Sequence, residues 1–151
     1  MDFAYLRHLM HGQPTVVEAV VADTQTIKVG NLVAIAAGLV TKVSASVHTN
    51  ILGMALEAIT TTTHTAASKI KVLLIDDFSV LRVAYTGTAG ALVEADVWTS
   101  NYDVEGTDPV TLHLDDETNG FLRPITLLDA AVSGYVDVVV AQAALWNAAL
   151  V

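Results

Sequence analysis

The chain contains no cysteine, and this absence excludes several kinds of chemistry. Without a thiol there is no disulfide, no thiolate nucleophile and no zinc site built on cysteine ligands. A domain that is stable without disulfides fits a reducing cytoplasm.

Charged residues are scarce, and basic residues especially so. Only 15% of the 151 residues are charged and 53% are hydrophobic, whereas a typical soluble domain carries about 25% charged residues. Seven Lys and Arg residues, scattered along the chain, stand against 16 Asp and Glu residues and give a net charge of −9. This balance predicts no nucleic-acid partner. The apolar surplus predicts an oligomer or a face that a partner covers.

Long apolar runs are absent as well. The longest ones, Leu32–Val40 and Val136–Leu145, are too short or too broken to cross a bilayer, which takes about 20 helical residues. The first residues also lack the basic head and apolar run of a secretory signal. We therefore expect no membrane partner and no secretory leader.

Recognisable catalytic motifs are missing too. The sequence has no Gly-rich phosphate loop, no Gly-x-Ser-x-Gly elbow and no His-Glu-x-x-His pair. His8 and His11 lie three residues apart, which is a weak metal signal. Asp76–Asp77 and Asp115–Glu117 suit either turns or a hard cation such as Ca²⁺, and turn chemistry is the favoured interpretation. We predict no enzyme, no catalytic residue, no cofactor and no metal.

Aromatic residues make up only 6% of the chain and are dispersed. Trp98, Tyr102 and Phe121 could share a face as a stacking platform, but core packing is the favoured interpretation. His113 stands between two leucines and is expected on the opposite face of a strand from them.

Short strand signals fill the part of the chain that follows residue 14. Val, Ile and Thr are frequent, and Gly, Pro, Asn and Asp separate the runs, a pattern typical of a sandwich or barrel. We predict an all-β fold, a small barrel or sandwich of short antiparallel strands. The expected strands are Thr15–Val21, Leu32–Ala36, Leu39–Val43, Gly53–Ala58, Ile70–Ile75, Ser79–Tyr85, Asp96–Thr99, Thr111–Leu114, Gly120–Thr126 and Tyr135–Ala141.

Four connecting segments carry further expectations. Asn119–Gly120 is a favoured pair for a tight hairpin turn. Thr60–Ser68, rich in Thr and Ala, predicts an exposed or mobile loop. A helical turn is expected around Leu127–Ala131. The tail, Ala141–Val151, leaves two alternatives, a short C-terminal helix or a final strand.

Residues 1–14 stand apart from the β-rich domain, residues 15–151. Their apolar positions follow a roughly helical spacing up to the breakers Gly12 and Pro14. Three alternatives remain: an arm or helical turn packed on its own domain, an extended arm that grips a neighbouring subunit, and frayed disorder. The residues of a gripping arm are Phe3, Tyr5, Leu6, Leu9 and Met10.

Three short motifs carry a resemblance to a known family. Together they make about residues 15–141 resemble the small β-barrel decoration, or cement, proteins of tailed bacteriophage capsids. The motifs are the strand start Val29-Gly30-x-Leu32-Val33, the segment Ile51-x-Gly53-x-Ala55, and the Gly-rich turn from Gly87 to Gly90 before Leu92-Val93.

The resemblance implies a structural virion protein on the outside of a capsid, made in the host cytoplasm. Its partners would be the major capsid protein and other copies of itself, as a homotrimer, and the family has no catalytic residues to carry over. A terminal arm often reaches a neighbour in such proteins, and deletion of residues 1–13 is then expected to leave the domain folded and to weaken assembly. The alternative function is a β-rich binding module of a phage tail, fibre or other surface assembly.

Overall fold

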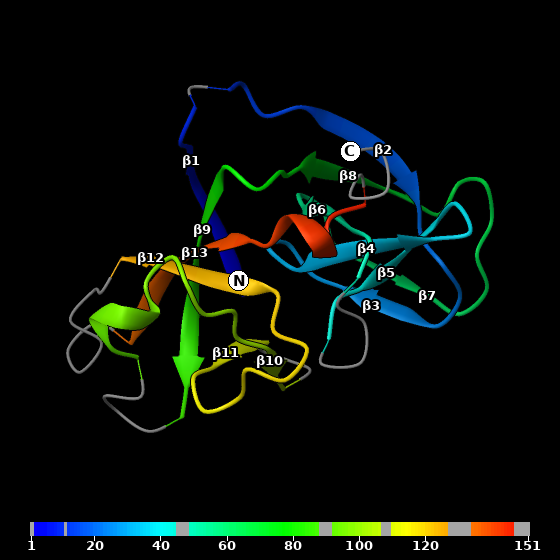
Figure 1. Ribbon diagram of the computed structural model, residues 1–151. Coiled ribbons are helices and arrows are strands. Elements are labelled where there is room, and N and C mark those ends of the chain that lie inside the picture. Colours follow the sequence, from blue (N-terminus) through cyan, green and yellow to red (C-terminus); the bar gives the residue numbers. More distant parts are fainter. Residues whose placement is uncertain are drawn as a thin grey trace.

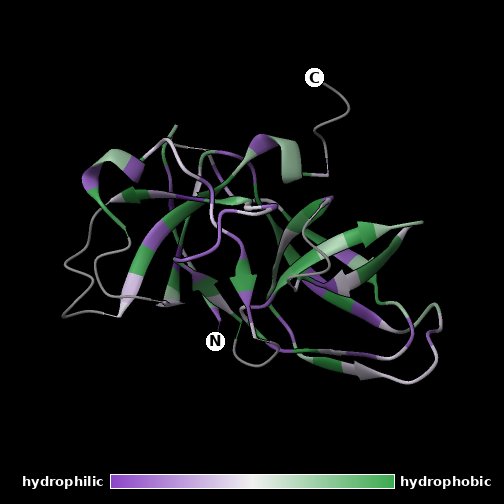
Figure 2. Ribbon diagram, turned by 60° about the horizontal axis from the view of Figure 1, so that its bottom comes forward, coloured by the Kyte–Doolittle hydropathy of each residue, from purple (hydrophilic) through white to green (hydrophobic). Residues whose placement is uncertain are grey.

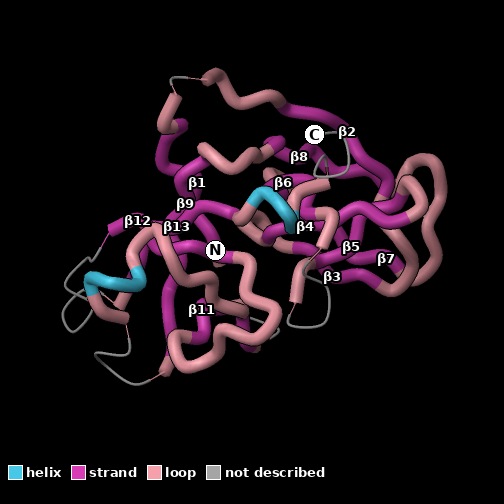
Figure 3. The backbone as a smooth tube through the Cα atoms, in the orientation of Figure 1, coloured by secondary structure: helices cyan, strands magenta, loops and turns pink. Residues whose placement is uncertain are grey.

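Strands lie at most of the places where the sequence predicts them. The computed structural model describes residues 2–10, 12–44, 49–87, 92–106, 110–126 and 134–146. The strands gather in two groups, and two short 3₁₀ turns, η1 (Glu94–Asp96) and η2 (Gln142–Ala144), are the helical elements of these residues (Figures 1 and 3). The predicted all-β fold is confirmed, in a sandwich-like form in which the described strands close no barrel.

The first group, called here the β9 sheet, is built around the long strand β9 (Ser79–Thr86). Its order is β10–β11–β9–β13–β12, and β1 pairs antiparallel with the first part of β9. The β11–β9 pair is parallel. The other strands of this sheet are β1 (Phe3–His8), β10 (Val104–Glu105), β11 (Thr111–His113), β12 (Leu122–Thr126) and β13 (Tyr135–Val140).

The second group, called here the β6 sheet, has the order β2–β8–β6–β4–β5 with antiparallel neighbours. Val21, just after β2, forms a parallel bridge to Val40 in β5. The sheet therefore curls until its two edges meet at one point. Its strands are β2 (Val16–Val20), β4 (Leu32–Ala36), β5 (Leu39–Lys42), β6 (Ile51–Ala55) and β8 (Lys69–Leu74); β3 (Gln25–Ile27) and β7 (Ile59–Thr61) form a separate antiparallel ribbon.

The main core lies between the two sheets. Successive side chains of a strand point to opposite faces, so Leu32 and Ile51 of the β6 sheet meet Leu81 and Val83 of the β9 sheet in one buried cluster. Along several strands, hydrophobic residues accordingly alternate with more hydrophilic ones (Figure 2). Phe3 of β1 belongs to this cluster and is 1% exposed.

A second core fills the inside of the curled β6 sheet. It buries Val33, Leu52 and Val72 from the sheet together with Ile27 from β3. Because β6 has a core on each of its faces, all five of its residues are buried. This explains why its sequence reads as a continuous apolar run rather than as an alternating one.

Two sequence predictions about these elements are wrong, and one predicted strand has different bounds. The expected strand Asp96–Thr99 is instead the end of η1 and a following turn. The strand expected at Gly53–Ala58 begins earlier and spans Ile51–Ala55. The Asn119–Gly120 turn is no hairpin, because it joins β11 to β12, and these strands pair with different neighbours.

Other expectations hold in part. The segment predicted as a loop from Thr60 to Ser68 starts inside β7, and its remaining residues up to Ala67 are exposed. Of the two alternatives for the tail, a short helix or a final strand, the part up to Trp146 has a short helical element: η2 is a single 3₁₀ turn, and Leu145 after it is buried in the main core. The helical turn expected at 127–131 lies outside the described residues.

The N-terminal segment packs on its own domain, which is one of the three alternatives that the sequence left open. It does so not as a helical turn but as a strand of the β9 sheet, paired from Phe3 with Val83 to His8 with Ser79. The N–H of Phe3 also donates to the carbonyl of Gly30, and the Asn31 amide donates to the Asp2 carboxylate at 2.7 Å. These bonds fasten β1 to the β6 sheet as well.

Tyr102, in the main core, carries a group that titrates abnormally. Its side chain is 2% exposed. Burial, with smaller contributions from the carboxylates of Asp96 and Glu117, raises the pKa of Tyr102 from 10.0 to about 12. The folded protein therefore keeps this proton at a pH where the unfolded chain has lost it.

We expect the free energy of unfolding to fall as the pH rises from about 10 to about 12 because of Tyr102. A raised pKa means that this stability is fully present below pH 10 and is lost above it, by a total of about 3 kcal/mol. Urea titrations across this range, with wild type and Tyr102→Phe, measure the loss. Tyr102→Phe should flatten the decline and the half-exposed control Tyr135→Phe should keep it; an equal decline in all three proteins would contradict the assignment.

Candidate partner-binding surface

None of the described strands covers one face of the β9 sheet. We call this surface of β1, β9, β13 and β12, which points away from the β6 sheet, the outer face. Leu81 and Val83 of β9 point into the core, so the residues that alternate with them point outward. Directly paired residues in antiparallel strands share a face. The register pairs Arg7 with Val80, Asp137 with Arg82, and Arg123 with Val139.

Apolar side chains dominate the middle and the rim of the outer face. Val80, Ile125 and Val139 form a small buried cluster there, and Leu9 packs against it. Around it, large apolar side chains stay open to solvent. They are five of the nine exposed large hydrophobic residues in the described part of the chain: Leu6, Met10, Phe78, Trp98 and Tyr135. A concentration of this kind is typical of interaction surfaces.

A groove of about 560 Å³ crosses one end of the outer face. Its volume lies in the usual range for binding sites, which are mostly apolar with a few placed polar groups. The groove has that character, because it combines the exposed Met10, Phe78 and Trp98 with the polar Asp77, Asn101 and Arg123.

Trp98 is held in an unusual backbone conformation at this groove. Its φ is +67°, a left-handed value that is rare for a bulky residue and costs of order 1–3 kcal/mol. Its N–H donates to the carbonyl of Pro124 in β12 at 2.9 Å. Although its backbone is fixed in this way, its side chain is 51% exposed. The fold thus stores strain to present an indole ring at the surface.

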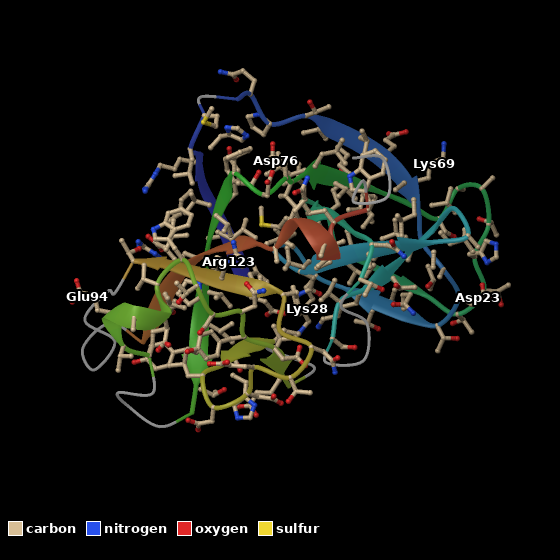
Figure 4. All side chains as sticks on the ribbon, viewed as in Figure 1. Asp23, Lys28, Lys69, Asp76, Glu94 and Arg123 are labelled. Carbon is tan, nitrogen blue, oxygen red and sulfur yellow. The ribbon has the colours of Figure 1, made fainter. Side chains whose placement is uncertain are left out.

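The polar groups of the outer face are fixed by hydrogen bonds. Arg82 donates to both carboxylate oxygens of Asp137, from Nε at 2.8 Å and from Nη2 at 3.1 Å. Arg123 donates from Nε to Oδ1 of Asn101 at 3.0 Å, and its Nη groups have no hydrogen-bond partner among the described residues. Arg123, labelled in Figure 4, belongs to β12, and among the described residues its Nη groups are donors that remain for a ligand.

His8, Asp76 and Ser79 form the one cluster that resembles catalytic machinery among the described residues. His8 Nε2 bonds to Asp76 Oδ2 at 2.8 Å, and Ser79 Oγ donates to Asp76 Oδ1 at 2.8 Å. In a nucleophilic triad the histidine stands between the serine and the carboxylate. Here the carboxylate stands in the middle, and Ser79 is 3% exposed, so the hydroxyl has neither the base nor the access that catalysis needs.

The same cluster has an evident structural role. His8 Nδ1 accepts hydrogen bonds from the backbone N–H groups of Met10 and Gly12 at 3.1 and 2.9 Å, which leaves Nε2 as the nitrogen that donates to Asp76. Burial acts to raise the pKa of Asp76, but the hydrogen bonds from His8, Ser79 and the Phe78 N–H outweigh it and hold the pKa below 3.8. The cluster fastens the chain after β1 to the turn before β9.

Replacing His8 with alanine is expected to speed hydrogen exchange at the amides of Met10 and Gly12, because both lose their acceptor. His8→Gln, whose side-chain carbonyl can accept, is the matched variant and should restore part of the protection. Exchange followed by NMR checks this. Unchanged protection of these two amides in His8→Ala would contradict the proposal that His8 fastens the chain after β1.

The five residues predicted as a gripping arm have different positions in the structure. Phe3 is buried in the main core and is not open to a neighbour. Tyr5 is partly buried and packs against the same core. Leu9 packs on the outer-face cluster. Leu6 and Met10 are 38% and 66% exposed, and their role in contacting a partner stays a prediction.

The acidic segments show the predicted turn chemistry. Asp76 Oδ1 accepts from the N–H of Phe78, and Asp116 Oδ1 accepts from the N–H of Thr118, as expected of Asp in turns. Within the described ranges, no group of three or more His, Asp or Glu residues is placed to hold a metal ion. His11, the partner of His8 in the weak metal signal, lies outside those ranges.

The predicted aromatic trio divides between core and surface. Tyr102 and Phe121 are each 2% exposed and share the main core, as core packing predicted, but Trp98 is half exposed. His113 is half-buried between the buried Leu112 and Leu114, which confirms its predicted side. No local sequence pattern indicates that Trp98 and Phe78 line one groove, since 20 positions separate them and the fold of the β9 sheet brings them together.

Comparisons with known proteins found no match. The chain matches no protein-family model, no curated protein and no solved structure. In the part of the chain that the structure describes, no helix has the length and apolar character needed to span a membrane.

Proposed function

We propose that this chain is a non-enzymatic structural protein that binds the outside of a tailed-phage capsid and stabilises the shell, as a homotrimer. The observation that carries the proposal is the outer face, where five large apolar side chains stay exposed beside a buried apolar cluster. A monomer in solution gains nothing from this arrangement, but an assembled protein buries it. The sequence resemblance to capsid decoration proteins supplies the capsid as the assembly.

The polar clusters support a structural role as well. Both ring nitrogens of His8 and both carboxylate oxygens of Asp76 are used in hydrogen bonds within the chain. A general base needs a free site for the proton that it takes. These side chains hold segments of the fold together instead.

Binding to a lattice also explains why a modest surface is enough. Many copies act on one shell, and each trimer links three contacts, so that binding of the first raises the effective concentration of the others. The net charge of −9 keeps free copies apart until a specific contact forms.

Two measurements test the proposal. Light scattering at several concentrations gives the mass in solution, and sedimentation with shells of the major capsid protein encoded in the same genome tests binding. We expect a trimer, free or on the shell, and co-sedimentation with shells. Protein that stays in the supernatant at all concentrations would contradict the proposal.

One observation favours the alternative, a binding module of a tail, fibre or other surface assembly. Phe78 and Trp98 line the same groove, and clustered aromatic residues are typical of such modules. Co-sedimentation with purified tails but not with shells would favour this second function.

A further inference from the structure

The arginines of this chain are not spread over its surface. The sequence has three, Arg7, Arg82 and Arg123, and the register of β1, β9 and β12 places all three on the outer face. The chain as a whole has 16 acidic residues against seven basic ones. In the four strands of the outer face this balance is reversed, because β1, β9, β12 and β13 contain one acidic residue, Asp137, against three arginines; Asp77 also lines the groove.

Arg7 and Arg123, on strands β1 and β12, differ from Arg82, which lies on β9 between them. Arg82 is neutralised by its two bonds to Asp137. Arg7 is exposed and has no side-chain hydrogen bond or ion pair among the described residues, and Arg123 lines the groove. A guanidinium binds carboxylates in a planar, two-pronged geometry. The face therefore offers two cationic donors at the border of an apolar surface, in a protein that is otherwise acidic.

We propose that the outer face docks on a protein surface that presents carboxylates around an exposed apolar side chain. The apolar side chain enters the groove against Trp98 and Phe78, while Arg123 and Arg7 bind the carboxylates. The same face of a second copy does not fit, because it would set arginines against arginines. The inference rests on the proposed function, because it takes this acidic partner to be the capsid shell. Contacts between copies of the chain then use surfaces other than the outer face.

The strained backbone of Trp98 agrees with this role. Anchor residues of interfaces are enriched in Trp and Arg and bind best when they are held in place beforehand. The backbone of Trp98 is fixed through its bond to Pro124, the residue after Arg123, so the turn that carries the ring is attached to the strand that carries the guanidinium.

Charge reversal with sedimentation tests the docking face. In Arg7→Glu/Arg123→Glu, binding to shells of the major capsid protein should weaken about 10-fold or more, and wild-type binding should weaken as NaCl rises from about 0.05 M to about 0.5 M. Trp98→Ala should weaken binding to a similar extent. The matched controls are Lys69→Glu, an exposed lysine far from Arg123 (Figure 4), and Trp146→Ala, an exposed tryptophan outside the groove; both should bind as wild type does.

Folding and oligomer mass are checked for every variant. Arg123→Lys, which keeps the charge, serves if Arg123→Glu fails to fold, and it should retain part of the binding. If wild type does not bind shells, the proposed function fails. If wild type binds and the folded variants bind equally well, the function stands and the docking face is wrong. If the variants lose oligomer mass together with shell binding, the face joins copies of the chain and the inference is overturned.

Discussion

Replacing Phe3 with alanine is expected to lower the free energy of unfolding by about 3–5 kcal/mol. The ring is 1% exposed and packs in the main core between the two sheets. Alanine would leave a cavity in a cluster that both sheets share, and β1 cannot collapse into it because its backbone is held by β9 and Gly30. Denaturant unfolding followed by fluorescence measures the loss.

Leu6→Ala is the matched control, since Leu6 lies in the same strand but is 38% exposed; we expect a loss within about 1 kcal/mol. Deletion of residues 1–13, expected from the sequence to leave a folded domain, should instead remove a strand and unfold the protein. A deletion variant with wild-type stability, or equal losses in Phe3→Ala and Leu6→Ala, would mean that residues 1–13 form a separate arm and do not contribute a strand to the fold.

The strands could be predicted where one physical signal was strong. Strands β4, β5, β8, β9 and β13 carry runs of β-branched and aliphatic residues between turn residues, and the structure has them where the sequence placed them. Strands β3, β7 and β10 are only two or three residues long, too short for any periodicity. The Asp96–Thr99 error has a different cause: Asp96 caps its own turn by accepting from the Val93 N–H, and this local bond wins over strand propensity.

The N-terminal segment shows how long-range pairing overrides local pattern. Positions 3, 6 and 10 have helical spacing, but Phe3 and Tyr5 alternate toward the core as in a strand, and a bulge between Tyr5 and Arg7 shifts the register. That bulge breaks the period of two that would have revealed β1. The partner strand begins more than 70 residues later, so no local signal could have identified it.

The candidate surface was still less visible in the sequence. Its arginines are scattered along the chain, and only the pairing of β1, β9 and β12 gathers them on one face. The groove needs Phe78 from the turn before β9 and Trp98 from the turn after η1. Sequence composition did predict that some apolar face is left for a partner, but its position is a property of topology.

Gly53, part of one of the motifs that carry the family resemblance, has a physical role that a substitution can test. It lies in the middle of β6 between β4 and β8, and a Cβ there would stand 2.0 Å from the backbone oxygen of Leu73. A backbone atom of a paired strand cannot move aside as a flexible side chain can. We therefore expect Gly53→Ala to lower the free energy of unfolding by about 3 kcal/mol or more, because β6 and β8 must separate.

The control adds bulk where space is open. Ala66 lies in the exposed loop after β7, and Ala66→Val should change the free energy of unfolding by less than about 0.5 kcal/mol. Urea midpoints of the two variants and wild type give the comparison, and equal slopes show that the same surface is exposed on unfolding. Because β6 contributes to both cores, moving it away from β8 should destabilise both sheets together. We therefore expect Gly53→Ala to unfold in a single transition at a lower urea concentration than wild type. A Gly53→Ala protein as stable as Ala66→Val would mean that β6 and β8 do not approach in this way.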